Sequence, residues 1–184
     1  YEYNKIILDE NHIFIPSKLF IYYNTRKIEK RINYDSGATI RNTIKSLNKY
    51  GVCCETKWNN DKSLFQHKPY DECYTSISLI KYYRICQNLD NIKYILEKEI
   101  PIIFGMSIYA NFNVINNNIL DIPDKTDKYI GGYCGLCVGF IQEKKLFIVR
   151  ASFGVEWGDK GYFYMPYDYV LNKGLCSDFW IVEN

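Results

Sequence analysis

Seven cysteines and two histidines are the residues of this chain that could act as nucleophiles, redox groups or metal ligands. Cys134 and Cys137 have the Cys-x-x-Cys spacing of redox pairs and zinc half-sites. The segment that holds them has the composition of a strand, and residues three apart on a strand point to opposite faces. A zinc site also needs four converging ligands. We therefore expect neither a metal nor a cofactor, and we interpret both cysteines as small buried apolar residues.

The other cysteines predict at most a single disulfide bond. An odd number of cysteines without periodic spacing argues against a disulfide framework. Cys73 could pair with Cys53 or with Cys54 in an oxidising compartment, and the sequence leaves both pairings open. His12 lies in a polar turn and His67 in a segment rich in lysine and proline, so we expect both to be solvated surface residues.

Composition indicates a folded and nearly neutral protein. Hydrophobic residues make up 47% of the 184 residues and aromatic residues 17%, which excludes a disordered chain. The net charge is +2. We interpret the largest basic cluster as a solvated helix face rather than a phosphate-binding patch, and we expect no nucleic-acid partner. The sequence has no signal segment and no apolar run near ~20 residues, so we expect a soluble protein without a membrane partner, in a compartment that stays open. The basic cluster consists of Arg26, Lys27, Lys30 and Arg31.

The first half of the chain is predicted to be helical. Residues 1–8 have helical spacing, and Pro16 and Ser17 precede a second helix with a broad apolar side. Ser36 is the expected cap of a third helix, because its hydroxyl can accept the free amide groups of the first turn. Gly51 would end that helix as a left-handed cap. The third helix carries an apolar stripe at i, i+4 and i+7, formed by Ile40, Ile44 and Leu47.

The second half of the chain is predicted to consist mainly of strands. Residues 53–74 and 111–126 are rich in polar residues, which is typical of loops. Residues 88–98 have the pattern of a short helix capped by Asp90. Helices followed by strands indicate an α+β fold whose two lobes meet near residue 100. The expected strands are residues 101–108, 133–140, 146–150, 162–165 and 178–182, and the short helix is expected to bury Ile92, Ile95 and Leu96.

Two stretches in the last third have a distinctive order of glycines and aromatic residues. Residues 131–140 read Gly-Gly-Tyr-Cys-Gly-Leu-Cys-Val-Gly-Phe, and residues 149–162 contain Val-Arg-Ala-Ser-Phe-Gly, then Glu-Trp-Gly, then Gly-Tyr. They resemble the papain-like cysteine peptidase family, in which a Gly-Gly-His-Ala strand ending in Val-Gly-Tyr precedes Asn-Ser-Trp-Gly, Trp-Gly and Gly-Tyr. Residues 35–53 and 14–20 resemble further segments of the family, so the resemblance extends from about Phe14 to Trp180.

The resemblance implies one domain over residues 1–184 with an α+β, two-lobed papain-like fold. A helical lobe would cover residues 1–99, and an antiparallel, β-barrel-like lobe would cover residues 100–184. The family's nucleophilic cysteine and its oxyanion-hole glutamine would lie before Tyr1. We therefore expect a chain that lacks this N-terminal segment, because none of its seven cysteines matches the nucleophile position.

The catalytic positions of the family hold unsuitable residues here. Hydrolysis by a thiol needs a thiolate, a histidine that moves the proton and an asparagine that orients this histidine. The resemblance places Tyr133 at the histidine position and Ala151 at the asparagine position. A phenol with a pKa near ~10 is a poor proton shuttle at neutral pH compared with an imidazole near ~6.5. Ala151 can orient nothing, while Phe153 keeps an aromatic ring at the family's shielding Trp. We therefore expect an inactive chain.

The resemblance also implies a peptide-binding cleft between the lobes. Gly37 and Ala38 would offer backbone groups to an extended peptide. Gly105 and Cys134 would flank the pocket for the second residue before the scissile bond, and Trp157 would line the primed side. A plain helix start at Gly37 and an ordinary core aromatic at Trp157 stay open as alternatives.

The expected partner is thus an extended peptide, a protein substrate or an inhibitor in the cleft. The first hypothesis for the function is a cysteine-type peptidase family member that has lost its activity. The alternative is a non-catalytic, peptide- or inhibitor-binding pseudopeptidase module. A third hypothesis is that the protein has a structural role, in which the fold serves only as a stable scaffold or an appended domain.

Overall fold

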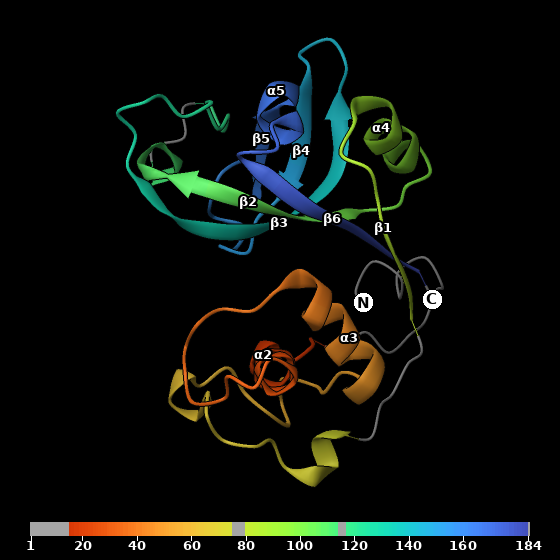
Figure 1. The fold of residues 1–184 in the computed structure, drawn as a ribbon, viewed down its shortest axis with the longest axis vertical. Coiled ribbons are helices and arrows are strands. Elements are labelled where there is room, and N and C mark those ends of the chain that lie inside the picture. Colours follow the sequence, from red (N-terminus) through yellow and green to blue (C-terminus); the bar gives the residue numbers. More distant parts are fainter. Residues whose placement is uncertain (1–14, 75–79, 114–116, 184) are drawn as a thin grey trace. The chain divides into compact units, whose positions relative to one another are not determined.

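The chain forms two compact units (Figure 1). Unit 1 comprises residues 1–82 with 182–184, and unit 2 comprises residues 83–181. A computed structural model describes residues 15–74, 80–113 and 117–183.

Some expectations from the sequence concern undescribed residues, and one concerns the boundary between the units. The helix expected over residues 1–8 and His12 both lie outside the described residues. The boundary expected near residue 100 falls after Tyr82, because helix α4 (Leu89–Glu97) packs on strands of unit 2.

Unit 1 is built around helix α2 (Lys18–Ile28), which the sequence predicts after Pro16. The Ser17 hydroxyl caps this helix by accepting the Phe20 N–H at 3.1 Å. Two short 3-10 helices, η1 (Lys62–Leu64) and η2 (Asp71–Tyr74), interrupt the polar connection that follows the second helix of the unit. The main buried cluster of the unit consists of Leu19, Phe20, Cys53, Trp58 and Cys73.

Helix α3 (Ile40–Tyr50) begins at a different cap from the one that the sequence predicts. The capping side chain is that of Thr39, so the prediction of Ser36 is wrong. Gly37 has a φ of +72°, a left-handed conformation that a right-handed helical turn excludes, and the helix therefore starts beyond it. The expected end is confirmed, because Gly51 closes the helix with a φ of +70°.

The basic cluster is not the solvated helix face that its charge predicts, because Arg26 is completely buried. Its guanidinium donates to the carbonyl of Ile32 at 2.7 Å, to that of Tyr34 at 3.1 Å and to that of Phe65. The same group stacks on two aromatic rings, 4.1 Å from the centroid of Tyr22 and 5.1 Å from that of Phe65. These carbonyls and rings replace the water that an exposed arginine would bind. The remaining members of the cluster are exposed as predicted: Lys27, Lys30 and Arg31.

The cysteines of unit 1 differ in their surroundings. Cys53 and Cys73 are buried in the same core. Burial, together with a hydrogen bond to the Cys73 thiol, raises the pKa of Cys53 to about 12. Cys54 lies 3.1 Å from the Thr56 hydroxyl, and this hydrogen bond lowers the pKa of Cys54. Of the two pairings that the sequence leaves open, the geometry favours Cys53 with Cys73, although both thiols are free in this structure.

A six-stranded sheet with the order β1-β6-β2-β3-β4-β5 forms the framework of unit 2 (Figure 1). The pairings of β2 with β3 and β6, of β3 with β4 and of β4 with β5 are all antiparallel. The five strands expected from the sequence are confirmed, whereas β1 and helix α5 (Tyr167–Leu171) are not predicted because both are short. The strands are β1 (Lys81–Arg84), β2 (Ile102–Tyr109), β3 (Tyr129–Ile141), β4 (Leu146–Arg150), β5 (Tyr162–Pro166) and β6 (Cys176–Glu183).

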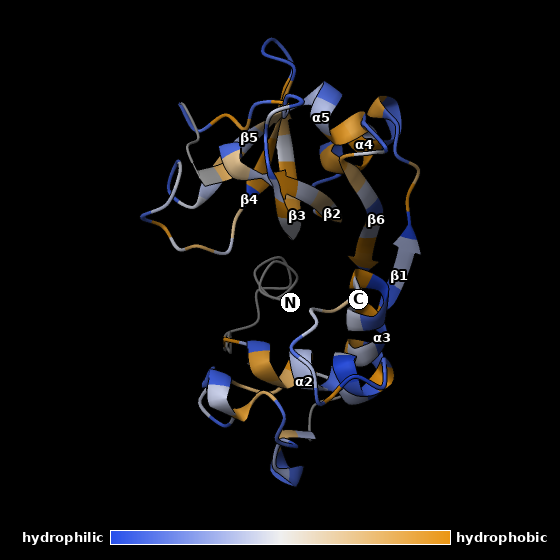
Figure 2. Ribbon diagram, turned by 60° about the vertical axis from the view of Figure 1, so that its left-hand side comes forward, coloured by the Kyte–Doolittle hydropathy of each residue, from blue (hydrophilic) through white to orange (hydrophobic). Residues whose placement is uncertain are grey.

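Helix α4 buries the residues that its spacing predicts but has another cap. The Asn88 side chain accepts the Asn91 N–H at 2.8 Å, so the prediction that Asp90 caps the helix is wrong. Asp90 instead lies in the first turn, where its carboxylate faces the positive end of the helix dipole. The apolar face is coloured orange in Figure 2, and its buried residues are Ile92, Ile95 and Leu96.

The core of unit 2 requires close packing around β3. A Cβ on Gly135 would lie 3.0 Å from a Val149 methyl and 3.1 Å from the Phe104 ring, so only glycine fits there without displacing them. Along the same strand Cys137 is buried and Cys134 is exposed. The two cysteines therefore point to opposite faces, as the strand pattern predicts, although Cys134 is not buried as expected.

Candidate functional site

Strand β3 holds the residues that the sequence singles out in unit 2, and β2 pairs with it. The register places Gly105 opposite Cys134 and Met106 opposite Tyr133. Gly105 and Cys134 are therefore direct neighbours across the two strands.

The loop after β4 meets Tyr133 through a pair of hydrogen bonds. The Tyr133 hydroxyl accepts the Ser152 N–H at 2.9 Å and lies 3.1 Å from the Ser152 hydroxyl. The neighbouring Ala151 N–H donates to the Gly161 carbonyl at 2.9 Å, which fixes the start of the loop. Tyr133 and the loop that carries Ala151 are thus brought together, and the phenol is held by a backbone amide.

An aromatic cluster surrounds this pair. The ring of Phe153 stacks on Tyr133 with centroids 5.4 Å apart and an interplanar angle of 16°. Trp157 packs against Phe153 at 5.0 Å and against Phe112 at 5.6 Å. Phe153 is half exposed at 50%, whereas Phe112 is buried and anchors the cluster on the core. Trp157 therefore belongs at once to the site and to the edge of the core.

Three thiols of unit 2, those of Cys134, Cys137 and Cys176, are not activated nucleophiles. Desolvation by the surrounding strands, and secondarily the Asp178 carboxylate, raises the pKa of Cys134 to about 11, even though the residue reaches the surface. Burial raises the pKa of Cys137 and of Cys176 to about 12 each. All three are therefore neutral thiols at pH 7, and a neutral thiol is a weak nucleophile. His67, the histidine within the described residues, is exposed in unit 1 as expected.

Gly37 and Ala38 belong to unit 1, in the connection between α2 and α3. The Gly37 N–H donates to the Tyr22 hydroxyl at 3.1 Å, and this hydroxyl donates to the Asp35 carboxylate at 2.5 Å. The space beside Gly37 is open, since a Cβ built there would meet no atom within 4 Å. Ala38 is exposed next to it. This segment consequently presents a backbone edge to solvent.

Two residues of the site were not assigned a role from the sequence. Ser152 is part of the Ala-Ser-Phe-Gly motif. Its backbone amide takes part in the site because it donates a hydrogen bond to the Tyr133 hydroxyl, and the fold brings these two groups together. Phe112 lies in an asparagine-rich segment that has the composition of a loop. A single large aromatic residue between two asparagines was the only sequence feature that could have indicated a buried anchor there.

The Tyr133 hydrogen bonds can be tested by removing the hydroxyl alone. We expect Tyr133→Phe to lower the free energy of unfolding by about 1 kcal/mol, because the Ser152 amide loses its acceptor. Urea denaturation followed by circular dichroism measures the change. Tyr94→Phe, at an exposed tyrosine of α4, is the control and should change it by less than about 0.5 kcal/mol. Equal effects of the two substitutions would show that the hydroxyl contributes nothing to the loop.

Two kinds of feature are absent from the described part of the chain. No group of three or more His, Cys, Asp or Glu side chains in this part of the chain could hold a metal ion. None of the helices described above combines the length and the apolar character needed to cross a membrane.

Comparison with protein sequences gives consistent matches. The model of the family described as papain family cysteine protease matches residues 23–182. An uncharacterised peptidase C1-like protein of Acanthamoeba polyphaga mimivirus is 40% identical over 197 residues, which cover 100% of this chain. The chain spans 63% of the length of that curated relative.

Comparison with solved structures gives the same answer for the fold. Xylellain, a cysteine protease from Xylella fastidiosa, is 39% identical with a TM-score of 0.90, over 98% of this chain and 74% of that one. Bromelain from Ananas comosus, in complex with the inhibitor E-64, is 17% identical with a TM-score of 0.70, over 98% of this chain and 82% of that one. The second likeness concerns the fold alone. Together they confirm the α+β, papain-like fold that the sequence predicts.

Proposed function

Since this chain belongs to the papain family of cysteine proteases, we propose that it is a degenerate member that binds extended peptides without cleaving them. The observation that carries the proposal is the hydrogen bonding of Tyr133 to Ser152. A group that must take up and release a proton has to face a nucleophile and a substrate. The Tyr133 hydroxyl instead holds the loop next to it, with Phe153 stacked on its ring.

Proton chemistry of the thiol-peptidase type is missing from both positions. A phenol keeps its proton at neutral pH and cannot form the ion pair with a thiolate that an imidazole forms. The methyl group of Ala151 has neither a donor nor an acceptor that could orient a partner. General acid–base catalysis of this kind contributes about 10²–10⁴-fold to a rate, so its loss alone removes most of the activity.

Binding of a peptide does not need this chemistry. An extended peptide pairs with an exposed backbone edge through main-chain hydrogen bonds. The open space beside Gly37 leaves room for such a strand, and the Gly37 carbonyl is the group we assign to pairing, because its N–H donates to Tyr22. For unit 2, taken by itself, we assign contacts with peptide side chains to Gly105 with Cys134 and to the half-buried Trp157. Papain-like neighbours in complex with E-64 support a cleft for peptide-like ligands.

Peptide binding and cleavage can be measured in the same samples. We expect fluorescein-labelled extended peptides to bind saturably in fluorescence anisotropy, and mass spectrometry to recover them intact after prolonged incubation. Gly37→Ala should weaken binding by about fivefold, because its methyl group enters the space reserved for the peptide. Asn33→Ala, at an exposed position of the same connection, is the matched control and should leave the affinity unchanged.

Each outcome bears on a separate part of the proposal. Cleavage that a thiol alkylator abolishes would show that the chain is an active peptidase. If no peptide binds saturably, the proposal of peptide binding is wrong, and the hypothesis that the fold serves only as a scaffold is favoured. The positive φ of Gly37 makes Ala strained there, so urea denaturation of both variants must accompany the affinities.

A further inference from the structure

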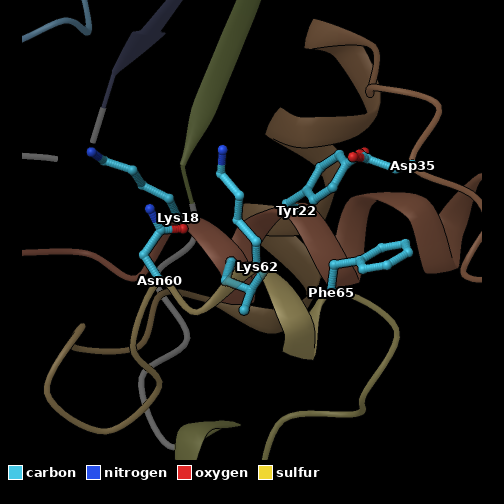
Figure 3. Close-up of a pocket in the computed structure, with 7 residues that line it drawn as sticks. Lys18, Tyr22, Asp35, Asn60, Lys62 and Phe65 are labelled. Carbon is cyan, nitrogen blue, oxygen red and sulfur yellow. The ribbon is translucent and has the colours of Figure 1, made fainter.

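Unit 1 contains a pocket outside the residues assigned to the peptide so far. Its volume is about 250 Å³, and it lies between the start of α2, the segment before Gly37 and the turn η1 (Figure 3). Lys18, Asn60 and Lys62 lie at one end of the pocket, and Asp35 lies at the other with Tyr22 between them. A volume of this size accommodates one side chain of a peptide.

The charges at the pocket favour an anionic group at the lysine end. Lys18 and Lys62 are exposed, and within the described ranges neither forms an ion pair. The nearby Asp61 carboxylate accepts the N–H of Ser63 at 2.9 Å and its hydroxyl at 2.8 Å and keeps its negative charge, but it does not line the pocket. Two ammonium groups with an amide beside them can bind a carboxylate.

A third positive charge lies behind the aromatic part of the lining. The buried Arg26 guanidinium stacks on the rings of Tyr22 and Phe65, both of which line the pocket. Its hydrogen bonds in the described structure go to carbonyl oxygens, which leave its full charge uncompensated. A buried charge acts through a lower effective dielectric than an exposed one, so Arg26 adds to the positive potential of the pocket. The single carboxylate of the lining, Asp35, lies at the far end and accepts from Tyr22.

The pocket and the proposed peptide edge share one atom. The Tyr22 hydroxyl donates to Asp35 within the pocket lining and accepts the N–H of Gly37. A peptide that pairs with Gly37 therefore passes the side of the pocket formed by Tyr22 and Asp35, and one of its side chains can extend toward the lysines.

We propose that this pocket selects an acidic side chain, Glu or Asp, of the extended peptide that binds beside Gly37. The inference rests on the proposed function, and it adds the substrate class: peptides with a carboxylate at one fixed position. Lys18 and Lys62 bind the carboxylate, Asn60 donates a hydrogen bond, and Tyr22 with Phe65 forms the apolar wall along the methylene groups.

A set of labelled peptides tests this selectivity. Each peptide has the same length and otherwise neutral residues, with Glu moved through successive positions, and each has a partner with Gln at the same place. We expect Glu to bind about fivefold more tightly than Gln at one position, in anisotropy at low ionic strength. The double variant Lys18→Gln with Lys62→Gln should reduce this ratio to about one. The double variant Lys30→Gln with Lys49→Gln changes the net charge of unit 1 equally at other exposed lysines and should preserve the ratio.

The outcomes separate this inference from the proposed function. Equal affinity for Glu and Gln peptides at every position, with Gly37→Ala still weakening binding, would overturn the acidic pocket and leave peptide binding in place. A ratio that survives in Lys18→Gln with Lys62→Gln would also overturn it. If no peptide binds saturably, both the inference and the proposed function fall.

Discussion

Replacement of Arg26 by methionine is expected to lower the free energy of unfolding of the chain by about 3–5 kcal/mol. Methionine fills much of the same space but donates no hydrogen bond. The carbonyls of Ile32, Tyr34 and Phe65 would then lose the donor with which they form part-buried hydrogen bonds. A buried acceptor that loses its partner costs about 1–3 kcal/mol, and the three losses are not fully additive.

Urea denaturation measures this effect, with the fluorescence of the buried Trp58 reporting on unit 1. Arg31→Met is the control, because Arg31 belongs to the same sequence cluster but is exposed, and a change below about 0.5 kcal/mol is expected. Arg26→Lys should fall between the two, since an ammonium keeps the charge but not the planar fork of donors. A loss of less than about 1 kcal/mol for Arg26→Met would contradict the role of the guanidinium in joining these segments.

The second large effect concerns the lost catalytic positions. We expect the combined substitution Tyr133→His with Ala151→Asn to leave this chain without thiol-dependent hydrolysis. When a segment carrying a cysteine at a helix N-terminus is added before Tyr1, the same substitutions should raise hydrolysis by at least about 10²-fold over the extended chain without them. The reason is that the imidazole can then move the proton between the thiol and the leaving amine.

A fluorogenic peptide, with and without a thiol alkylator, measures both parts of this prediction. Serine in place of the added cysteine is the control and should abolish the gain. Hydrolysis by the doubly substituted chain without the added segment would place the nucleophile among the seven cysteines already present. Circular dichroism of the variant is needed as well, because Tyr133→His also removes the hydrogen bonds to Ser152.

The strands of unit 2 were predictable because their signals are local. Strand β4 has the predicted bounds of residues 146–150, and the other expected strands differ from the observed ones by a few residues at their ends. Alternating burial also predicted that Cys134 and Cys137 point to opposite faces. The short strand β1 was not predicted, because two of its four residues are charged. Its place in the sheet depends on the neighbouring strand β6, which is far from it in the sequence.

The capping residues of two helices could not be predicted from the local sequence. Ser36 and Asp90 are good capping residues by type, yet Thr39 and Asn88 cap the two helices. Several residues before a helix can serve as its cap. The choice depends on where the backbone turns, as the positive φ of Gly37 illustrates.

The sequence by itself determined the family and the α+β fold, and it predicted the loss of proton chemistry at Tyr133 and Ala151. Residue type and spacing along one strand and one loop are sufficient for those inferences. Only the tertiary structure decided that Arg26 is buried, that Tyr133 binds Ser152 and that two lysines line a pocket together with Tyr22. Arg26 reaches a carbonyl 39 positions away, and Tyr133 reaches an amide 19 positions away. Burial and hydrogen-bond partners at such separations depend on how distant segments pack, which no local pattern encodes.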